Sequence, residues 1–123
     1  MLIRLAAVLA LLATPAAAQT PDPDSVFPNA GGYYDGCKGA AGWAGAAAMD
    51  RERGRSLNDE LSRVRIAEAG RPWLARQIEI TRHVWGRPDV SPREFHDYYL
   101  MTCEDRVDDR LSERRQQFYD RVR

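Results

Sequence analysis

The stretch CKGAAGWAGAAAMDRER, residues 37–53, decides the fold of this chain. Alanine, the residue with the highest helix propensity, dominates it. Residues that can share one helix face recur at helical spacing, namely Ala40, Trp43, Ala44, Ala47 and Ala48. Gly54 follows directly and suits the left-handed conformation in which many helices end. The stretch therefore predicts a helix with a thin face that another helix can approach closely.

Two further helices are predicted immediately downstream. Ser56 can cap the first turn of the second helix, with Asp59 completing a capping-box pattern, and Gly70 ends it. Pro72 suits the first turn of the third helix, which stops before Gly86. The wide apolar arc of this third segment indicates a central helix.

The fourth helix has the clearest start in the chain. Ser91 is its predicted N-cap, Pro92 its first residue, and Glu94 is placed to close a capping box. Val90 and Phe95 fit the hydrophobic staple around that start. We expect this helix to continue into a charged stretch that projects as a solvated helix or frays.

No window alternates apolar and polar residues over several positions, so no strand is expected. The patterns together predict an all-α fold: a small four-helix domain over residues 35–123 with a charged C-terminal tail. Residues 19–34, which contain prolines and glycines and few apolar side chains, are predicted to form a flexible leader.

The first 18 residues, MLIRLAAVLALLATPAAA, have the pattern of a secretory signal peptide. One early charge, Arg4, precedes a short apolar run, and three small residues precede Gln19. We expect cleavage between Ala18 and Gln19 and a periplasmic or secreted protein. A lipoprotein would carry a cysteine directly after that site, where Gln19 stands. No later apolar run reaches the roughly 20 residues of a membrane helix, so stable membrane insertion is not expected after cleavage.

Export would place the two cysteines, Cys37 and Cys103, in an oxidising compartment. We therefore predict one disulfide that joins the first and last predicted helices. Such a bridge would stabilise the fold by about 4 kcal/mol in the chain-entropy treatment. The alternative, a pair of redox-active thiols, lacks the Cys-x-x-Cys spacing of such sites.

The charge balance argues against a nucleic-acid partner. The chain carries 18 basic and 18 acidic residues, and loss of Arg4 with the signal leaves 17 basic residues, a net charge of −1. No whole-molecule field attracts nucleic acid or an anionic membrane at that charge.

The two histidines are the candidates for catalysis or metal binding. His96 and Asp97 resemble the His-Asp dyad of secreted phospholipases A2, in which the histidine activates water and the aspartate holds calcium. The cysteine and glycine-rich calcium loop of that family are missing. His83 lies four residues after Glu79, but a second histidine at helical spacing is lacking. We predict no catalytic residue, no metal ligand and no cofactor, with a hydrolase using His96 and Asp97 as the minor alternative.

The arrangement as a whole resembles a group of small exported proteobacterial helical proteins with two bracketing cysteines. The resemblance is carried by Cys37, the segment RERGRS at 51–56, Trp85, Tyr98, Tyr99 and Cys103. It implies a helical fold and no particular activity. More distantly, the size and the single long-range disulfide are similar to the HdeA-type periplasmic chaperones, from which the alanine-rich first helix departs.

The leading functional hypothesis is a non-enzymatic protein that binds another envelope protein in an accessory or subunit role. Its candidate contacts are Tyr33, Tyr34 and Trp43, because aromatic residues are enriched at contact hot spots. Packing in the core is the alternative role for each of them. An acid-stress chaperone is the second functional hypothesis, because acid would neutralise the carboxylates and leave the chain strongly cationic.

Overall fold

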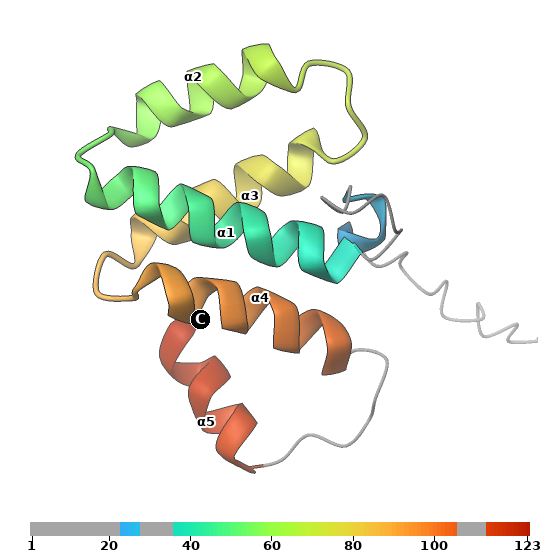
Figure 1. The fold of residues 1–123 in the computed structure, drawn as a ribbon, viewed down its shortest axis with the longest axis vertical. Helices are drawn as coiled ribbons and strands as arrows, with labels where there is room; N and C mark the ends of the chain where they lie inside the picture. The colour runs from blue at the N-terminus through green and yellow to red at the C-terminus, as the bar shows by residue number, and fades with distance from the viewer. Residues whose placement is uncertain (1–22, 28–35, 106–112) are drawn as a thin grey trace, which may run out of the picture.

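The computed structural model describes residues 23–27, 36–105 and 113–123 (Figure 1). Its elements are the 3₁₀ helix η1 (Pro23–Val26) and the helices α1 (Gly36–Glu52), α2 (Leu57–Ala67), α3 (Leu74–Gly86), α4 (Pro92–Asp105) and α5 (Glu113–Val122). These ranges contain no strand, which confirms the predicted all-α class. The predicted signal peptide, Tyr33 and Tyr34 lie outside the described residues. No helix in the described ranges is long and apolar enough to cross a membrane.

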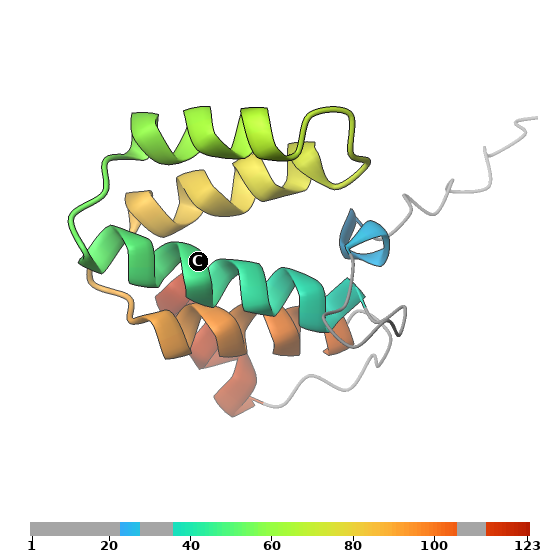
Figure 2. The ribbon, with the colours of Figure 1, turned by 45° about the horizontal axis from the view of Figure 1, so that its top comes forward.

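Helix α1 lies between α3 and α4, and α2 covers the far side of α3 (Figure 2). The alanine face of α1 is fully packed, with Ala40, Ala41, Ala44 and Ala48 inaccessible to solvent. A Cβ added at Gly45 would lie 3.4 Å from the Cβ of His96 and 3.5 Å from the carbonyl oxygen of Pro92. The thin face predicted from the sequence therefore serves the close approach of α1 and α4.

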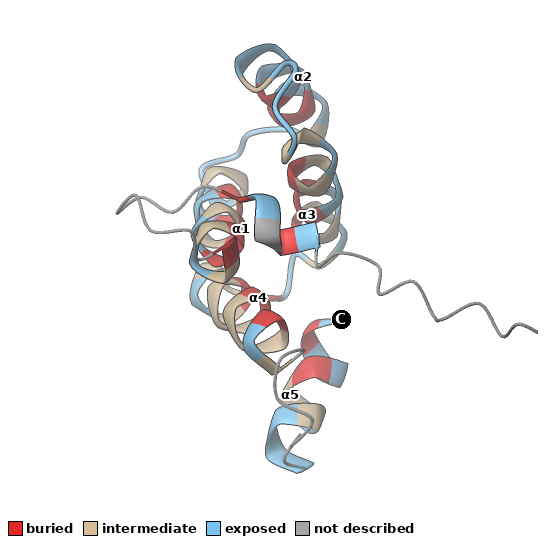
Figure 3. Ribbon diagram, turned by 90° about the vertical axis from the view of Figure 1, so that its right-hand side faces the viewer, coloured by how far each residue is buried: buried red, intermediate tan, exposed pale blue. Residues whose placement is uncertain are grey.

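The larger core side chains come from α3, α4 and the loop between them. Ile80, Val84, Val90 and Phe95 are buried against the alanines of α1, and Figure 3 shows buried positions on the facing sides of these helices. Helix α3 begins at Leu74, two residues after the predicted Pro72, because residues 72 and 73 form a turn. Contact with both α1 and α2 explains the wide apolar arc of α3.

The predicted caps at Ser56, Ser91, Gly54 and Gly70 are present in the structure. The Ser56 hydroxyl accepts a hydrogen bond from the backbone N–H of Asp59 at 3.1 Å. At the start of α4, the backbone N–H of Glu94 donates to the Ser91 hydroxyl, and the Glu94 carboxylate accepts from the backbone N–H of Ser91, both at 3.2 Å. Gly54 and Gly70 have φ of 91° and 76°, the left-handed conformation that glycine adopts readily.

The predicted disulfide is also confirmed. Cys37 in the first turn of α1 is bonded to Cys103 near the end of α4, with a Cα–Cα distance of 5.4 Å. Over the residues that the structure describes, α4 is followed by a further helix, α5, which makes one α-helix more than the four predicted. Tyr119 and Val122 are buried and hold α5 in place despite its high charge.

Part of the predicted leader is docked on the domain. Asp24 in η1 is fully buried, and its carboxylate accepts from the guanidinium of Arg76 in α3 at 2.7 Å. Phe27 is also buried and belongs to the core. Residues 23–27 of the predicted leader are therefore packed against the domain, through an ion pair and one aromatic side chain.

Candidate functional site

A cavity of about 330 Å³ opens between α1, α3 with the turn before it, and Phe27. We call it the tryptophan pocket, and the residues that line it are Phe27, Lys38, Gly39, Gly42, Trp43, Ala46, Glu68, Trp73 and Gln77. Helix α1 contributes three small residues together with Lys38 and Trp43, and α3 and its preceding turn contribute further large side chains. The pocket thus combines small residues of α1 with aromatic side chains from α1, from the turn before α3 and from Phe27.

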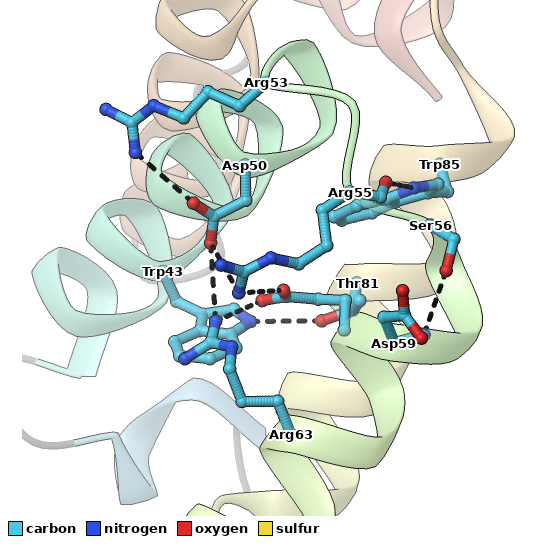
Figure 4. A network of polar contacts seen from close by, with 10 residues as sticks. Trp43, Asp50, Arg53, Arg55, Ser56, Asp59, Arg63, Thr81 and Trp85 are labelled. Carbon is cyan, nitrogen blue, oxygen red and sulfur yellow. Dashed lines mark hydrogen bonds and ion pairs between the residues drawn. The ribbon is translucent and has the colours of Figure 1, made fainter.

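The two indole rings of the pocket are held by hydrogen bonds of their own. The Trp43 N–H donates to the hydroxyl of Thr81 at 3.3 Å, which Figure 4 shows. The Trp73 N–H donates to the carboxylate of Glu68 at 3.0 Å. The N–H group of each indole is therefore already hydrogen-bonded within the chain. The rings offer the cavity apolar surface in a fixed orientation.

Gln77 is the unusual member of the lining. Its side chain is 4% exposed, and its Oε1 is buried without a hydrogen-bond partner among the described residues. Thr81, one turn later, is buried as well, but its hydroxyl accepts from Trp43 and donates to the Gln77 carbonyl oxygen at 2.7 Å. Buried polar atoms in proteins are normally paired, so this unpaired acceptor is an exception within the core.

A second cavity, of about 350 Å³, lies on another face of α3 and is lined by Arg76, Glu79, His83, Tyr98, Tyr99, Thr102 and Arg123. Its main polar groups already have partners within the chain. Arg76 pairs with Asp24 and with Glu79 at 2.9 Å, and the Thr102 hydroxyl donates to the Tyr98 carbonyl oxygen. These internal pairs make it a less favourable ligand site than the tryptophan pocket.

His83, a candidate metal ligand with Glu79, has a structural role. Its Nδ1 lies 2.5 Å from the Tyr99 hydroxyl, and its Nε2 lies 3.0 Å from the carbonyl oxygen of Val122 in α5. Burial, aided by the nearby Arg87 and Arg76, lowers the pKa of His83 below its ordinary value, although the bond to Val122 opposes the shift. His83 thus stays neutral at physiological pH while it joins α3 to α4 and α5.

The predicted His96–Asp97 pair stands alone on the surface. Its Nδ1–Oδ1 distance is 3.0 Å, and both side chains are more than 40% exposed. Neither residue lines one of the two cavities described above. Over residues 23–27, 36–105 and 113–123, no three His, Cys, Asp or Glu side chains are grouped as metal ligands would be.

A network of charged side chains fixes the end of α1 to α2 (Figure 4). Glu60 is fully buried and pairs with Arg63 at 2.5 Å and with Arg55 at 3.0 Å. Both arginines also approach the carboxylate of Asp50 in α1. The network positions α2 and, through α3, the far wall of the tryptophan pocket, so its contribution to the site is indirect.

Of the three predicted contact residues, Trp43 lies in the tryptophan pocket and is half-buried, while Tyr33 and Tyr34 fall outside the described residues. The sequence analysis singled out neither Trp73 nor Gln77 as a site residue. The available signal was the presence of two polar residues, Gln77 and Thr81, on the core face of α3. The Thr81 hydroxyl is hydrogen-bonded within the chain, whereas Oε1 of Gln77 has no partner among the described residues.

Comparison with known proteins adds no relative to these observations. No protein-family model matches the chain, and neither the curated proteins nor the solved structures yield a match.

Proposed function

We propose that this chain is an exported, non-enzymatic helical protein that binds another protein of the cell envelope. The observation that carries the proposal is the tryptophan pocket, which combines ordered indole rings with an unpaired buried acceptor on Gln77. Tryptophan is among the residues most enriched at binding hot spots, and such hot spots occupy well-packed pockets. The pocket thus has the composition of a contact site for a partner.

Two features support a location in the periplasm or outside the cell. The N-terminal 18 residues have the composition of a signal peptide. The Cys37–Cys103 bridge is a long-range structural disulfide, a type that persists in oxidising compartments and is rare in the cytosol. A partner in the same compartment follows from that location.

The histidines support a binding role over a catalytic one. Both ring nitrogens of His83 are hydrogen-bonded, to Tyr99 and to Val122, so neither nitrogen is free to act on a substrate. His96 and Asp97 lie exposed and outside both cavities. A hydrolase remains the weaker proposal, and loss of hydrolysis in a His96→Gln variant of a demonstrably active preparation would be needed to support it.

Site-specific photocrosslinking tests the proposed binding. A photoreactive amino acid at Ala46, an exposed residue of the pocket lining, is expected to capture one dominant partner from the native envelope. The matched control carries the same group at Ile66, which is 81% exposed on α2 and outside the pocket. Equal capture from both positions, or no capture from Ala46, would contradict the proposal.

An acid-stress chaperone is the second candidate, and one observation favours it. Two fully buried carboxylates, Asp24 and Glu60, hold η1 and α2 through arginine partners. Loss of these ion pairs would weaken the cover that Phe27 gives the core. A client-aggregation assay at about pH 2 to 3 tests this candidate. Failure to expose apolar surface or to suppress precipitation there would eliminate it.

A further inference from the structure

We propose that residues 23–27 dock on the domain as an intramolecular ligand, and that a segment of the partner protein with a carboxylate and an aromatic ring three residues apart displaces them. We call residues 23–27 the strap. The strap seat is Arg76 together with the surface of α1 and α3 against which Phe27 is buried. This inference rests on the proposed function, because it states what the partner must present.

The strap presents two buried side chains from a single turn, which lies beside the start of α1 (Figures 1 and 2). The Asp24 carboxylate is fully buried and accepts from Nε and Nη2 of Arg76 at 2.7 and 3.3 Å, a two-point contact that the arginine fork favours. The backbone N–H of Phe27 donates to the carbonyl oxygen of Asp24 at 3.1 Å, which fixes the spacing of the two side chains. Val26, between them, is 41% exposed. A short peptide with this spacing can present the same two groups.

Arg76 is placed to receive a carboxylate from outside the helices α1 to α5. Its side chain is 10% exposed, and its guanidinium lies 5.5 Å from the centroid of the Tyr99 ring. Glu79 on the same helix pairs with it at 2.9 Å but is 67% exposed, so water screens that pair. A nearly buried cation is stable only with a partner that is buried with it. The helices therefore form a site for a carboxylate, and Asp24 fills that site in this structure.

The groove under the strap is longer than the strap. Phe27 lines the tryptophan pocket, so about 330 Å³ of space remains beside it. A competing segment shifts the equilibrium away from the docked strap only through contacts that the strap does not make. Trp43 and Trp73 line the uncovered space, and a segment longer than the strap can cover them. The uncovered surface thus supplies the difference in affinity that displacement needs.

The covalent attachment of the strap makes it an autoinhibitory contact. Residues 28–35 join the strap to α1, and a short linker gives an attached ligand an effective concentration in the millimolar range. A free segment therefore has to compete with the strap for Arg76. We expect the seat to bind free peptides weakly in the intact chain and more tightly once the strap is prevented from docking.

Hydrogen exchange of the unaltered, disulfide-linked chain is the first test. The Phe27 amide is hydrogen-bonded inside the strap, and the Val84 amide lies in α3 at a residue that is fully buried. If the strap opens by itself, the protection factor of the Phe27 amide should be at least about 100-fold below that of the Val84 amide. Equal protection factors would show that the strap opens only when the whole domain unfolds, and would overturn the proposal.

Peptide binding in trans is the second test. The double variant Asp24→Ala, Phe27→Ala of the full chain empties the seat, and the probe is acetyl-PDSVF-amide, the sequence of residues 23–27. NMR should show shift changes at the Arg76 Nε–H and at the Trp43 indole. Peptides that carry Asp24→Asn or Phe27→Ala should bind at least about 10-fold more weakly, and the chain with its own strap should bind the probe more weakly as well.

Each other result of the peptide test overturns the proposal. Equal binding of the three peptides would show that neither anchor is recognised. Absence of binding to the folded double variant would show that the seat takes no segment in trans. Circular dichroism reports whether the double variant is folded, and loss of the fold would show that the strap is an integral part of the domain.

Gly42 allows the tryptophan pocket to be tested separately from the strap seat. Gly42 lines the pocket, and a Cβ built there meets no atom within 4 Å. Gly42→Leu therefore places a side chain at the pocket and leaves the Asp24–Arg76 pair in place. Gly42→Ala is the matched control, because it makes the same backbone change and adds only one methyl group.

Photocrosslinking from Ala46 separates this inference from the proposed function. If the partner displaces the strap, its recovery should rise roughly 10-fold in the Asp24→Ala, Phe27→Ala background, and acetyl-PDSVF-amide should compete with it there. If recovery is unchanged in that background, the protein binds a partner without displacing the strap, and this inference fails alone. If no partner is captured in either background, the proposed function fails whatever the peptides do. Capture of a second copy of the chain, through exchange of straps, would overturn the proposal of a different protein.

Discussion

The guanidinium of Arg51, near the end of α1, donates to the carbonyl oxygen of Val90 in the α3–α4 loop at 2.7 Å. The same group donates to the carbonyl oxygens of Val84 at 2.7 Å and Arg87 at 3.0 Å. It also lies over the ring of Phe95, with a distance of 5.6 Å from its central carbon to the ring centroid. One arginine therefore ties the end of α3, the following loop and the start of α4 to α1.

This geometry predicts a large effect of a small substitution. Arg51→Lys keeps the charge but loses the planar fork of donors, so several carbonyl oxygens lose their partners. We expect the free energy of unfolding to fall by about 2 to 4 kcal/mol. Urea denaturation measures it, and Arg53→Lys is the control, since Arg53 is exposed and its guanidinium meets one carboxylate, that of Asp50, at 3.5 Å. Similar losses in both variants would contradict the special role of Arg51.

The disulfide gives a second prediction. The Cys37–Cys103 bridge closes a sequence separation of 66 residues, so its removal should lower the free energy of unfolding by about 4 kcal/mol. Urea denaturation with and without a reductant measures the effect. The double variant Cys37→Ser, Cys103→Ser should show the lower stability in both conditions. A reductant effect of equal size in that variant would show that another process is responsible.

His83 makes the stability dependent on pH. Because its pKa is lowered in the folded protein, the unfolded chain takes up a proton first as the pH falls. The free energy of unfolding should therefore decrease from about pH 6.5 down to the folded-state pKa of His83. His83→Gln should flatten this part of the profile, with His96→Gln as the control for loss of a histidine. An unchanged slope in His83→Gln would refute the account.

Two glycine substitutions should act in opposite directions. At Gly42, inside α1, alanine meets no neighbouring atom and should stabilise the fold by about 0.5 to 1 kcal/mol. At Gly54, where φ is 91°, alanine should destabilise it by about 1 to 2 kcal/mol, because a Cβ is strained in the left-handed conformation. Thermal denaturation measures the change in melting temperature of each variant. A change of the same sign in both variants would be inconsistent with these backbone roles.

The sequence predicts local features of this fold well because they depend on nearby residues. The capping box of Ser91 and Glu94 and the left-handed Gly54 each involve a few consecutive positions. The pairing of the two cysteines followed from their number and from the export signal. Alanine spacing likewise identified the packed face of α1.

The features that sequence reasoning missed depend on contacts between distant segments. Arg76 meets Asp24 across 52 positions, and Arg51 meets Val90 across 39, with no local pattern to indicate either pair. The separate helix α5 depends on its burial of Tyr119 and Val122, which charge density alone did not indicate.

Only part of the candidate site could be predicted from the sequence. Trp43 was identified by residue type, because exposed aromatic residues are frequent contact residues. Gln77 was not identified, since a buried glutamine is usually paired and only the structure shows that its oxygen is not. A binding pocket formed by two helices and a preceding segment appears only when those elements are placed together.

The measurement that tests the central claim most directly is photocrosslinking from Ala46 in the native envelope, compared between Gly42→Ala and Gly42→Leu backgrounds. A partner protein that enters the tryptophan pocket predicts one dominant crosslinked protein with Gly42→Ala and at least a tenfold loss of it with Gly42→Leu, which corresponds to about 1.4 kcal/mol or more. Equal recovery in the two backgrounds, or no crosslinked protein in either, would contradict the claim.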